Sequence, residues 1–324
     1  MQGAFLIARK FAIPLLLIGA MLMSLCSCDK REYKTALKLI DQGEYEEAYE
    51  ILTSLGDYKD ARDYLDRFCY VPVRATLESG AADCYVDIIL QKNNQPLRFI
   101  AYRDDAIRHQ LSYAYDAEGK LLQQNDANGT GYNNYVTRYT YDQNGNCSQT
   151  ALLDANGKTV TLTQNTYDKA GKLMESTLVS YGVEAGRYIY MYDVKGRLTK
   201  CIWHAGGMDT VTEYVYDDGG MLIRETTTTP NGSVKSITYV RDEKGAPQRV
   251  VFYESGYSDA LMTCTLTLDE NGNVIRIQTE SPYEASLTYE FTYAFVYAPY
   301  GLNPGVREQL TQLYDILRNV YVNP

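Results

Sequence analysis

The pattern of apolar and polar positions changes once along the chain. Residues 29–68 follow a helical period, with one apolar stripe at positions 36–40 and a second at positions 48–55. From Tyr70 onward the side chains alternate with a period of two, as residues 134–141 show, and this alternation is typical of strands with two different faces. The pattern therefore predicts a mainly β protein with a small helical hairpin at its N-terminal end.

One phrase, Tyr-x-Tyr-Asp-x-x-Gly-x-Leu, recurs through the strand region. Its first clear copy starts at Tyr113, and its aspartates follow one another at intervals of 26, 26, 25, 24, 25 and 27 residues. A fixed period of this size indicates a repeat architecture. The Asp and Gly positions of the copies are Asp116, Gly119, Asp142, Gly145, Asp168, Gly171, Asp193, Gly196, Asp217, Gly220, Asp242, Gly245, Asp269 and Gly272.

The phrase has a physical interpretation as a hairpin corner. The Asp can accept hydrogen bonds from the amides ahead of it, which starts a turn. The Gly supplies the positive φ of a type I turn with a following bulge. A second, looser turn is expected between the corners, at residues 126–129, 154–157, 205–207 and 230–232. Each period then holds two strands, and the product is an elongated antiparallel meander.

The ends of the chain complete the domain plan. Residues 84–90 and 97–102 read as a first hairpin before the phrase is established, and residues 287–297 as a final strand or strand pair. A helical pattern at 304–324 is expected to cap an exposed sheet edge. The expected domains are a signal at 1–27, helices at 28–69, the sheet at 70–303 and the cap at 304–324.

The composition is unusually rich in tyrosine. The chain of 324 residues has 31 Tyr against 7 Phe and 1 Trp, so much of its apolar area carries a hydroxyl that needs a partner. The paired tyrosines of the phrase project from one face, where they either stack on each other or bind a saccharide or peptide. The candidate binding face is Tyr113, Tyr115, Tyr139, Tyr141, Tyr190, Tyr192, Tyr214 and Tyr216. A net charge of −10 argues against a nucleic-acid partner.

The first residues have the features of a targeting segment. Arg9 and Lys10 precede an apolar run over residues 11–25, and Ser27 precedes Cys28. This resembles a bacterial lipoprotein signal, which implies lipidation of Cys28 and an exported protein anchored by lipid on the extracytoplasmic side of a cell membrane. The alternative is a transmembrane anchor, although the run is short against the span of about 20 residues that a bilayer needs.

Catalytic and metal-binding patterns are absent from the sequence. Five cysteines remain outside the signal, with no C-x-x-C spacing, and they read as small buried hydrophobes, although export would permit a Cys69–Cys84 disulfide. His109 and His204 stand in no ligand motif. Residues 126–129 supply only the start of a calcium loop, so a plain turn is the better interpretation. No cofactor, no metal and no enzymatic activity are expected.

Two resemblances add to this picture. The helical segment resembles a tetratricopeptide hairpin through Gly43, Tyr45, Glu47 and Ala48, although it is barely longer than one unit. The phrase resembles the YD repeat of Rhs-type and wall-associated bacterial surface proteins, over roughly half of the chain. The period is longer than the family's, and the copies decay after Asp217, so the last hairpins are expected to pack differently.

The expected function is a lipid-anchored binding or scaffold protein of the bacterial envelope, which contacts cell-wall glycan or another surface protein through its repeat sheet. The Rhs resemblance implies an alternative, an accessory or remnant of a toxin-delivery system. A wall-polymer hydrolase is a third hypothesis, because paired carboxylates can cleave glycosidic bonds. The turn aspartates are better explained by turn formation than by a converging active site.

Overall fold

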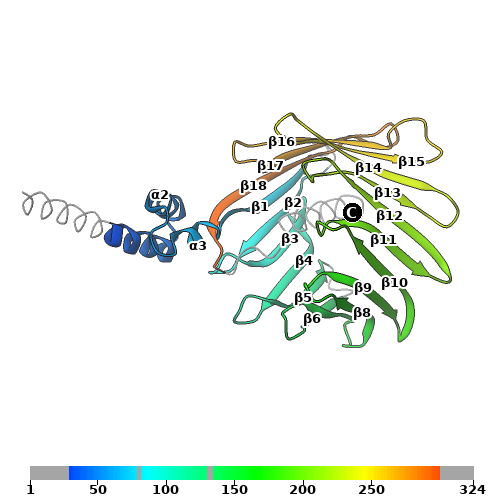
Figure 1. The fold of residues 1–324 in the computed structure, drawn as a ribbon, viewed down its shortest axis with the longest axis horizontal. Helices are drawn as coiled ribbons and strands as arrows, with labels where there is room; N and C mark the ends of the chain where they lie inside the picture. The colour runs from blue at the N-terminus through cyan, green and yellow to red at the C-terminus, as the bar shows by residue number, and fades with distance from the viewer. Residues whose placement is uncertain (1–28, 79–81, 130–133, 300–324) are drawn as a thin grey trace, which may run out of the picture. The chain divides into compact units, whose positions relative to one another are not determined.

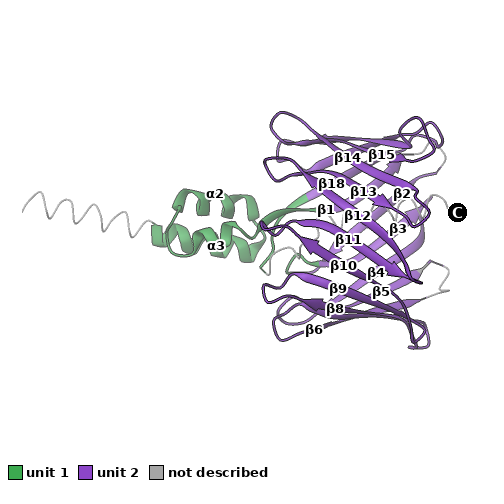
Figure 2. Ribbon diagram, turned by 45° about the vertical axis from the view of Figure 1, so that its right-hand side comes forward, with its two compact units in different colours: residues 1–71, 92–95, 294–306 green, residues 72–91, 96–293, 307–324 purple. Residues whose placement is uncertain are grey.

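The computed structural model describes residues 29–78, 82–129 and 134–299. These residues divide into two compact units, which Figure 2 shows in different colours. One unit holds residues up to 71 together with 92–95 and the residues from 294, and the other holds 72–91 and 96–293. The expected signal at 1–27, the lipidation residue Cys28 and the expected cap at 304–324 lie outside the described residues.

The first unit is built from three short helices. They span residues 29–42, α2 (Tyr45–Leu55) and α3 (Ala61–Leu65). Gly43 ends the first helix with a φ of 84°, a conformation that glycine adopts at little cost. Ala36, Leu52 and Ala61 are fully buried in one cluster, because the small alanine side chains let neighbouring helices approach closely. The predicted small helical segment is therefore present, and its kinship to tetratricopeptide hairpins stays a prediction.

An aromatic cluster lies beside these helices within the same unit. The ring of Phe68 stacks on Phe295 at 5.5 Å between centroids and meets the edge of Tyr49 at 5.4 Å. The Asn94 side chain, held at a φ of 61°, donates hydrogen bonds to the Tyr45 hydroxyl at 2.8 Å and to the Tyr297 carbonyl oxygen at 3.0 Å. The hairpin turn at 92–95 is thus bound to the helical unit.

The second unit contains most of a sheet of 18 antiparallel strands. The strands are β1 (Phe68–Glu78), β2 (Cys84–Leu90), β3 (Pro96–Arg103), β4 (Ala106–Tyr115), β5 (Leu121–Asn128), β6 (Tyr135–Tyr141), β7 (Cys147–Leu153), β8 (Thr159–Tyr167), β9 (Leu173–Ser180), β10 (Val183–Tyr192), β11 (Leu198–Ala205), β12 (Met208–Tyr216), β13 (Leu222–Thr228), β14 (Val234–Arg241), β15 (Pro247–Glu254), β16 (Met262–Leu268), β17 (Val274–Glu280) and β18 (Thr288–Tyr297). Each strand pairs with the next one along the chain, so the predicted antiparallel meander is confirmed (Figure 1).

The meander closes on itself, because β1 pairs with β18 as well as with β2. The sequence pattern predicts an exposed edge that residues 304–324 would cap, and this expectation is wrong for the described strands, whose first and last members pair. The physical reason lies in β1, which precedes the first phrase copy and has no repeat signature, yet supplies the closing strand. Closure removes the unpaired amides and carbonyls that an open edge would present.

The strand registers show which side chains lie on the same face of the sheet from one strand to the next. Residues paired across strands share a face, so the pairs Tyr139 with Thr150 and Tyr190 with Cys201 extend the face that the phrase tyrosines occupy. We call this side the tyrosine face. The buried core of the sheet lies on it, where Val86, Phe99 and Tyr289 pack together. The opposite face carries ion pairs such as Arg74–Asp87 and Lys200–Glu213.

Candidate functional site

The repeat aspartates form seven hairpin corners of one geometry. At Asp193 the Oδ1 atom accepts hydrogen bonds from the amides of Lys195 and Arg197, both at 2.9 Å, and Gly196 follows with a φ of 81°. Each of the seven aspartates accepts the amide of the residue four positions on. The glycine of each corner has a φ between 79° and 85°. These residues therefore belong to turns, at one end of the strands.

Hydrogen bonding at these corners favours the ionised carboxylate. In Asp193 the Arg197 amide is the main cause, and it holds the pKa of the carboxyl below its ordinary value of 3.8. In Asp142 and Asp269 the main cause is the side-chain amide of Asn146 or Asn273, which likewise lowers the pKa. These three aspartates are thus fixed as turn anions, and none of them is available as a proton donor near neutral pH.

The second tyrosine of the phrase in four copies, together with Tyr293 of β18, ties a strand to the one before it. Each hydroxyl donates a hydrogen bond to a carbonyl oxygen at the start of the preceding strand. The pairs are Tyr141 to Leu121, Tyr167 to Cys147, Tyr192 to Leu173, Tyr216 to Leu198 and Tyr293 to Val274, at 2.7 to 2.9 Å. A cation from the preceding corner covers three of these rings: Lys120 over Tyr141, Lys172 over Tyr192 and Arg197 over Tyr216. We call this series the tyrosine ladder.

The eight candidate binding tyrosines are therefore mostly engaged in the fold. Tyr113 is buried, and the other seven, including Tyr115 and Tyr139, are half-buried. Burial raises the pKa of Tyr214 to about 12. Burial is also the main cause of the raised pKa of Tyr190, and a hydrogen bond involving Ser176 acts in the opposite direction. These rings stack and form hydrogen bonds within the sheet. They therefore offer a ligand little exposed surface.

Exposed tyrosines gather instead at the other end of the strands. Tyr253, Tyr257 and Tyr283 are 45%, 51% and 54% exposed, and the rings of Tyr257 and Tyr283 meet edge to face at 5.2 Å. They line a pocket of about 580 Å³ with Ile237 and Phe252, which we call the tyrosine pocket. Sequence reasoning missed it, because Tyr257 and Tyr283 stand in loops outside the phrase. The signal in the sequence that could have indicated the pocket is that these two tyrosines do not belong to the repeat phrase.

Charged groups give the tyrosine pocket its polar chemistry. Lys235 pairs with Glu254 at 3.4 Å, and Glu225 accepts a hydrogen bond from the Tyr239 hydroxyl at 2.5 Å. Glu284 also lines the pocket. Rings that can stack on a ligand thus stand beside hydrogen-bonding groups of both charges, a combination that suits a polyhydroxylated or peptide ligand.

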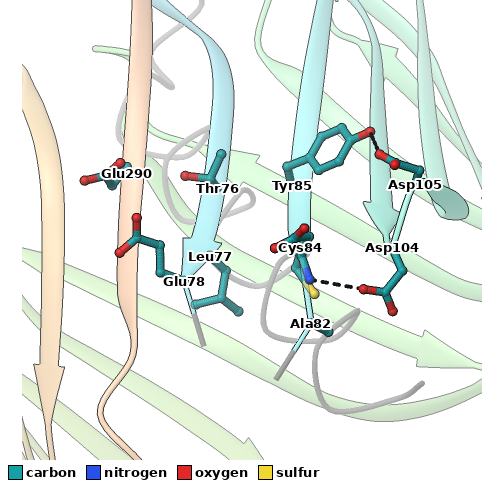
Figure 3. A pocket seen from close by; sticks show the side chains of 10 residues that line it. Thr76, Leu77, Glu78, Ala82, Cys84, Tyr85, Asp104, Asp105 and Glu290 are labelled. Atoms are coloured by element: carbon teal, nitrogen blue, oxygen red, sulfur yellow. Dashed lines mark hydrogen bonds between the residues drawn. The ribbon is translucent and has the colours of Figure 1, made fainter. Parts of the chain in front are cut away.

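A second pocket, of about 750 Å³, is acidic (Figure 3). It is lined by Glu78, Asp83, Asp104, Asp105 and Glu290. The Tyr85 hydroxyl donates to Asp105 at 2.9 Å, the Asp83 amide donates to Asp104 at 3.2 Å, and Arg276 pairs with Glu290. Several of its carboxylates therefore already have partners. Across the part of the chain that the structure describes, no three His, Cys, Asp or Glu side chains are grouped to hold a metal ion.

The histidines do not converge on a common site. His109 lies 3.5 Å from Asp126 on the tyrosine face, whereas His204 bonds Asp209 at 2.6 Å through Nδ1 on the opposite face. Asp126 lies in β5 and pairs with Leu111 of β4, so the turn expected at 126–129 is wrong for residues 126–128, which belong to β5. The strand continues because these three residues keep their ladder partners in β4.

The cysteines outside the expected signal form no disulfide. Cys69, Cys84, Cys147, Cys201 and Cys264 are free thiols, and burial raises the pKa of Cys264 to about 11, which disfavours its thiolate. The Cys69–Cys84 disulfide that export would permit is therefore not formed. None of the helices among residues 29–299 that the structure describes is long and apolar enough to cross a membrane.

Comparison with known proteins locates the repeat. A porin-like protein from Bacteroides uniformis shares 12% identity at a TM-score of 0.41, with 69% of this chain and 96% of that chain covered. A TcdB2–TccC3–Cdc42 structure shares 16% identity at a TM-score of 0.29, with 58% and 12% covered. No curated protein matches the sequence. The model of the family described as RHS Repeat matches residues 115–159, which span the corners at Asp116 and Asp142, so this part of the chain is similar to an RHS repeat.

Proposed function

We propose that this protein is a non-enzymatic, lipid-anchored binding protein of the bacterial envelope, and that its repeat sheet holds a glycan in the tyrosine pocket. The observation that carries the proposal is the cluster of Tyr253, Tyr257 and Tyr283, which are about half exposed around a cavity of about 580 Å³. In the rest of the repeat sheet the phrase tyrosines serve packing and hydrogen bonding. These three rings are therefore the tyrosines best placed to meet a ligand.

A glycan fits the chemistry of the pocket. The apolar face of a sugar ring can lie against Tyr257 or Tyr283, while hydroxyl and amide groups bond to charged side chains such as Lys235 and Glu254. The volume falls within the range of about 300 to 1,000 Å³ that small-molecule sites occupy. Peptidoglycan fragments combine sugar rings with charged peptide stems, so they match the stacking and the charged groups together.

The test is a calorimetric titration of the full-length protein in detergent with soluble peptidoglycan fragments. Tyr257→Ala is expected to weaken binding by about tenfold, since aromatic contacts contribute roughly 0.5 to 1.5 kcal/mol each. Tyr181→Ala is a matched control, because Tyr181 is 69% exposed in a loop that does not line the pocket. Unchanged binding in Tyr257→Ala and Tyr283→Ala would overturn the assignment of the pocket.

The anchor is a separate part of the proposal and rests on the sequence pattern before Cys28. Replacing Cys28 with Ser is expected to move the protein from the membrane fraction to the soluble extracytoplasmic fraction, and to abolish incorporation of labelled palmitate. A Cys28→Ser protein that stays in the membrane fraction would contradict lipid anchoring and favour a transmembrane anchor instead.

The similarity of residues 115–159 to an RHS repeat favours a second candidate, an accessory role in an Rhs-type toxin-delivery system. In that case the repeat sheet would bind a protein partner, and affinity purification from the native organism would recover a toxin with its immunity protein. A third candidate, hydrolysis of wall polymer, predicts that the purified protein releases fragments from peptidoglycan. Our proposal predicts binding without release.

A further inference from the structure

We infer that the glycan held in the tyrosine pocket carries a protonated amine, which the pocket binds through its aromatic rings and through the carboxylate of Glu225. The inference rests on the proposed function of the pocket and narrows the class of its ligand. A cation is attracted both to the face of an aromatic ring and to a carboxylate, so a cavity that offers the two together suits an ammonium group. The structure supplies both in one cavity of about 580 Å³.

The part of the pocket that lies on the sheet is set by the register of three neighbouring strands, β13, β14 and β15 (Figure 1). Glu225 lies opposite Ile237, and Ile237 lies opposite Phe252, so the three side chains share one face of the sheet. Glu225 also lies opposite Tyr214 of β12, which puts this row on the tyrosine face. A carboxylate therefore stands beside apolar side chains, which strengthen its attraction for a cation by excluding water.

Two exposed rings border the pocket from loops. Tyr257 is 51% exposed and Tyr283 is 54% exposed, and their rings meet edge to face at 5.2 Å between centroids and an angle of 69°. In this arrangement the edge of one ring covers one face of the other, so the pair does not use the remaining ring faces. Among the described residues, neither ring has a further ring partner or a cation over it. The exposed halves of both rings are therefore available to a ligand cation.

The charges in the pocket favour a cationic ligand. Its lining holds the carboxylates of Glu225, Glu254 and Glu284 and one cation, Lys235. Lys235 is already paired with Glu254 at 3.4 Å. Glu225 accepts a hydrogen bond from the neutral Tyr239 hydroxyl, which leaves its negative charge without a counter-ion among the described residues. An anionic ligand would compete with Glu254 for Lys235, whereas an ammonium group meets a carboxylate that no described cation occupies.

The arginines of the same three strands do not offset this charge. Arg224 of β13 comes directly before Glu225, and Arg249 of β15 lies opposite Val240, so the two-residue period of the strands directs both away from the tyrosine face. Arg241 is the last residue of β14, at the corner end, where it bonds the Gly245 carbonyl oxygen. The negative charge of the pocket therefore faces the ligand.

The experiment titrates the full-length protein in detergent with two tetrasaccharides that differ in one group on each sugar. Glucosamine tetramer has free amines, which are protonated at about pH 6, and chitotetraose has the same amines acetylated. Calorimetry at equal ionic strength is expected to show about tenfold tighter binding of glucosamine tetramer, because only its ammonium groups can interact with the rings and the carboxylate.

Variants of the pocket charges test the residues. Glu225→Gln keeps an oxygen that can accept from Tyr239 and removes the charge, so it should bind glucosamine tetramer about tenfold more weakly and chitotetraose as the wild type does. Glu243→Gln is the matched control, because it removes the same charge from the exposed corner between β14 and β15, outside the pocket. Lys235→Gln should bind glucosamine tetramer more tightly, since Glu254 loses its competing cation, and it decides the case if Glu225→Gln does not fold.

A further titration distinguishes the two places where a peptidoglycan fragment can carry an amine, the sugar ring and the peptide stem. Soluble fragments are titrated before and after chemical acetylation of their stem amines. Weaker binding of the acetylated fragments supports recognition of the stem amine. Unchanged binding of the acetylated fragments, together with tighter binding of glucosamine tetramer than of chitotetraose, supports recognition of an amine on the sugar.

The contrary outcomes separate the amine from the pocket. Equal affinity for the two tetrasaccharides, with fragments that bind equally before and after acetylation, overturns the amine and leaves the proposed function standing. Equal weakening in Glu225→Gln and Glu243→Gln, or weaker binding of glucosamine tetramer in Lys235→Gln, also overturns it. The proposed function fails by a different result, which is unchanged binding of peptidoglycan fragments in Tyr257→Ala and Tyr283→Ala.

Discussion

The hydroxyl of Tyr216 donates a hydrogen bond to the carbonyl oxygen of Leu198 at 2.7 Å, while the Arg197 guanidinium lies 4.7 Å from the centre of the same ring. Tyr216 comes from one repeat, and Leu198 and Arg197 from the repeat before it. The same relationship recurs at Tyr141 and Tyr192. Each of these repeats is therefore joined to its neighbour by a side chain as well as by the backbone ladder.

Removing one hydroxyl of the ladder should weaken this joint. Tyr216→Phe keeps the ring and loses the bond to Leu198, so we expect a loss of about 1 kcal/mol in the free energy of unfolding. Urea denaturation measures it. Tyr188→Phe is the control, since Tyr188 is exposed and lies outside the tyrosine ladder. Equal stability of the two variants would show that the ladder bond contributes nothing.

The ladder has a gap at Arg241, which stands where the phrase has its second tyrosine. Arg241 bonds the Gly245 carbonyl oxygen of its own corner, and its buried Nε has no hydrogen-bond partner among the described residues. Arg241→Tyr places a hydroxyl within reach of the start of β13 and removes the unpaired nitrogen. We expect a gain of about 1 kcal/mol in the free energy of unfolding, measured by urea denaturation. A destabilised variant would show that the corner at Asp242 requires the arginine.

The local turns of the fold were predictable from the sequence. Asp193 and Gly196 lie three residues apart, so their turn depends on nearby backbone alone, and the last two copies keep the corner although they lost tyrosines. The last two copies thus differ from the earlier ones in the tyrosine ladder and not in the corner. The bond from Tyr216 to Leu198 depends on strand register, which the phrase does not specify.

The non-local pairings could not be predicted. Closure pairs β1 with β18, and β1 has no repeat signature that would identify its partner. The tyrosine pocket combines loops near Tyr257 and Tyr283 with strands β13 and β14. Residues brought together across several strands leave no fixed spacing in the sequence, so the sequence pattern indicates the phrase tyrosines instead.

The corner glycines should be sensitive to any Cβ atom. Gly272 has a φ of 81°, and a Cβ added there would meet no described atom within 4 Å beyond its chain neighbours, so Gly272→Ala isolates the backbone cost. We expect a loss of about 1 to 2 kcal/mol in the free energy of unfolding. Gly272→Asn should lose less, because asparagine tolerates the left-handed region. Thermal denaturation distinguishes them, and an alanine variant as stable as the asparagine variant would contradict the assigned φ.

Acid should weaken the corners. The folded pKa of Asp193 lies below its ordinary value of 3.8, so its contribution is complete above that pH and is lost as the pH falls through the lower folded value. Stability measured from about pH 5 to about pH 2 should therefore fall less steeply in Asp193→Asn than in the wild type. Asp259→Asn, in an exposed loop, should keep the wild-type slope. Identical slopes in all three proteins would contradict the prediction.

The exposed tyrosines of the pocket, and not the phrase tyrosines, are proposed to hold the glycan. Calorimetric titration of peptidoglycan fragments into Tyr257→Ala and into Tyr139→Phe tests this assignment in one comparison. We expect about tenfold weaker binding in Tyr257→Ala and unchanged binding in Tyr139→Phe. Unchanged binding in Tyr257→Ala together with weakened binding in Tyr139→Phe would refute the assignment and return the site to the phrase tyrosines.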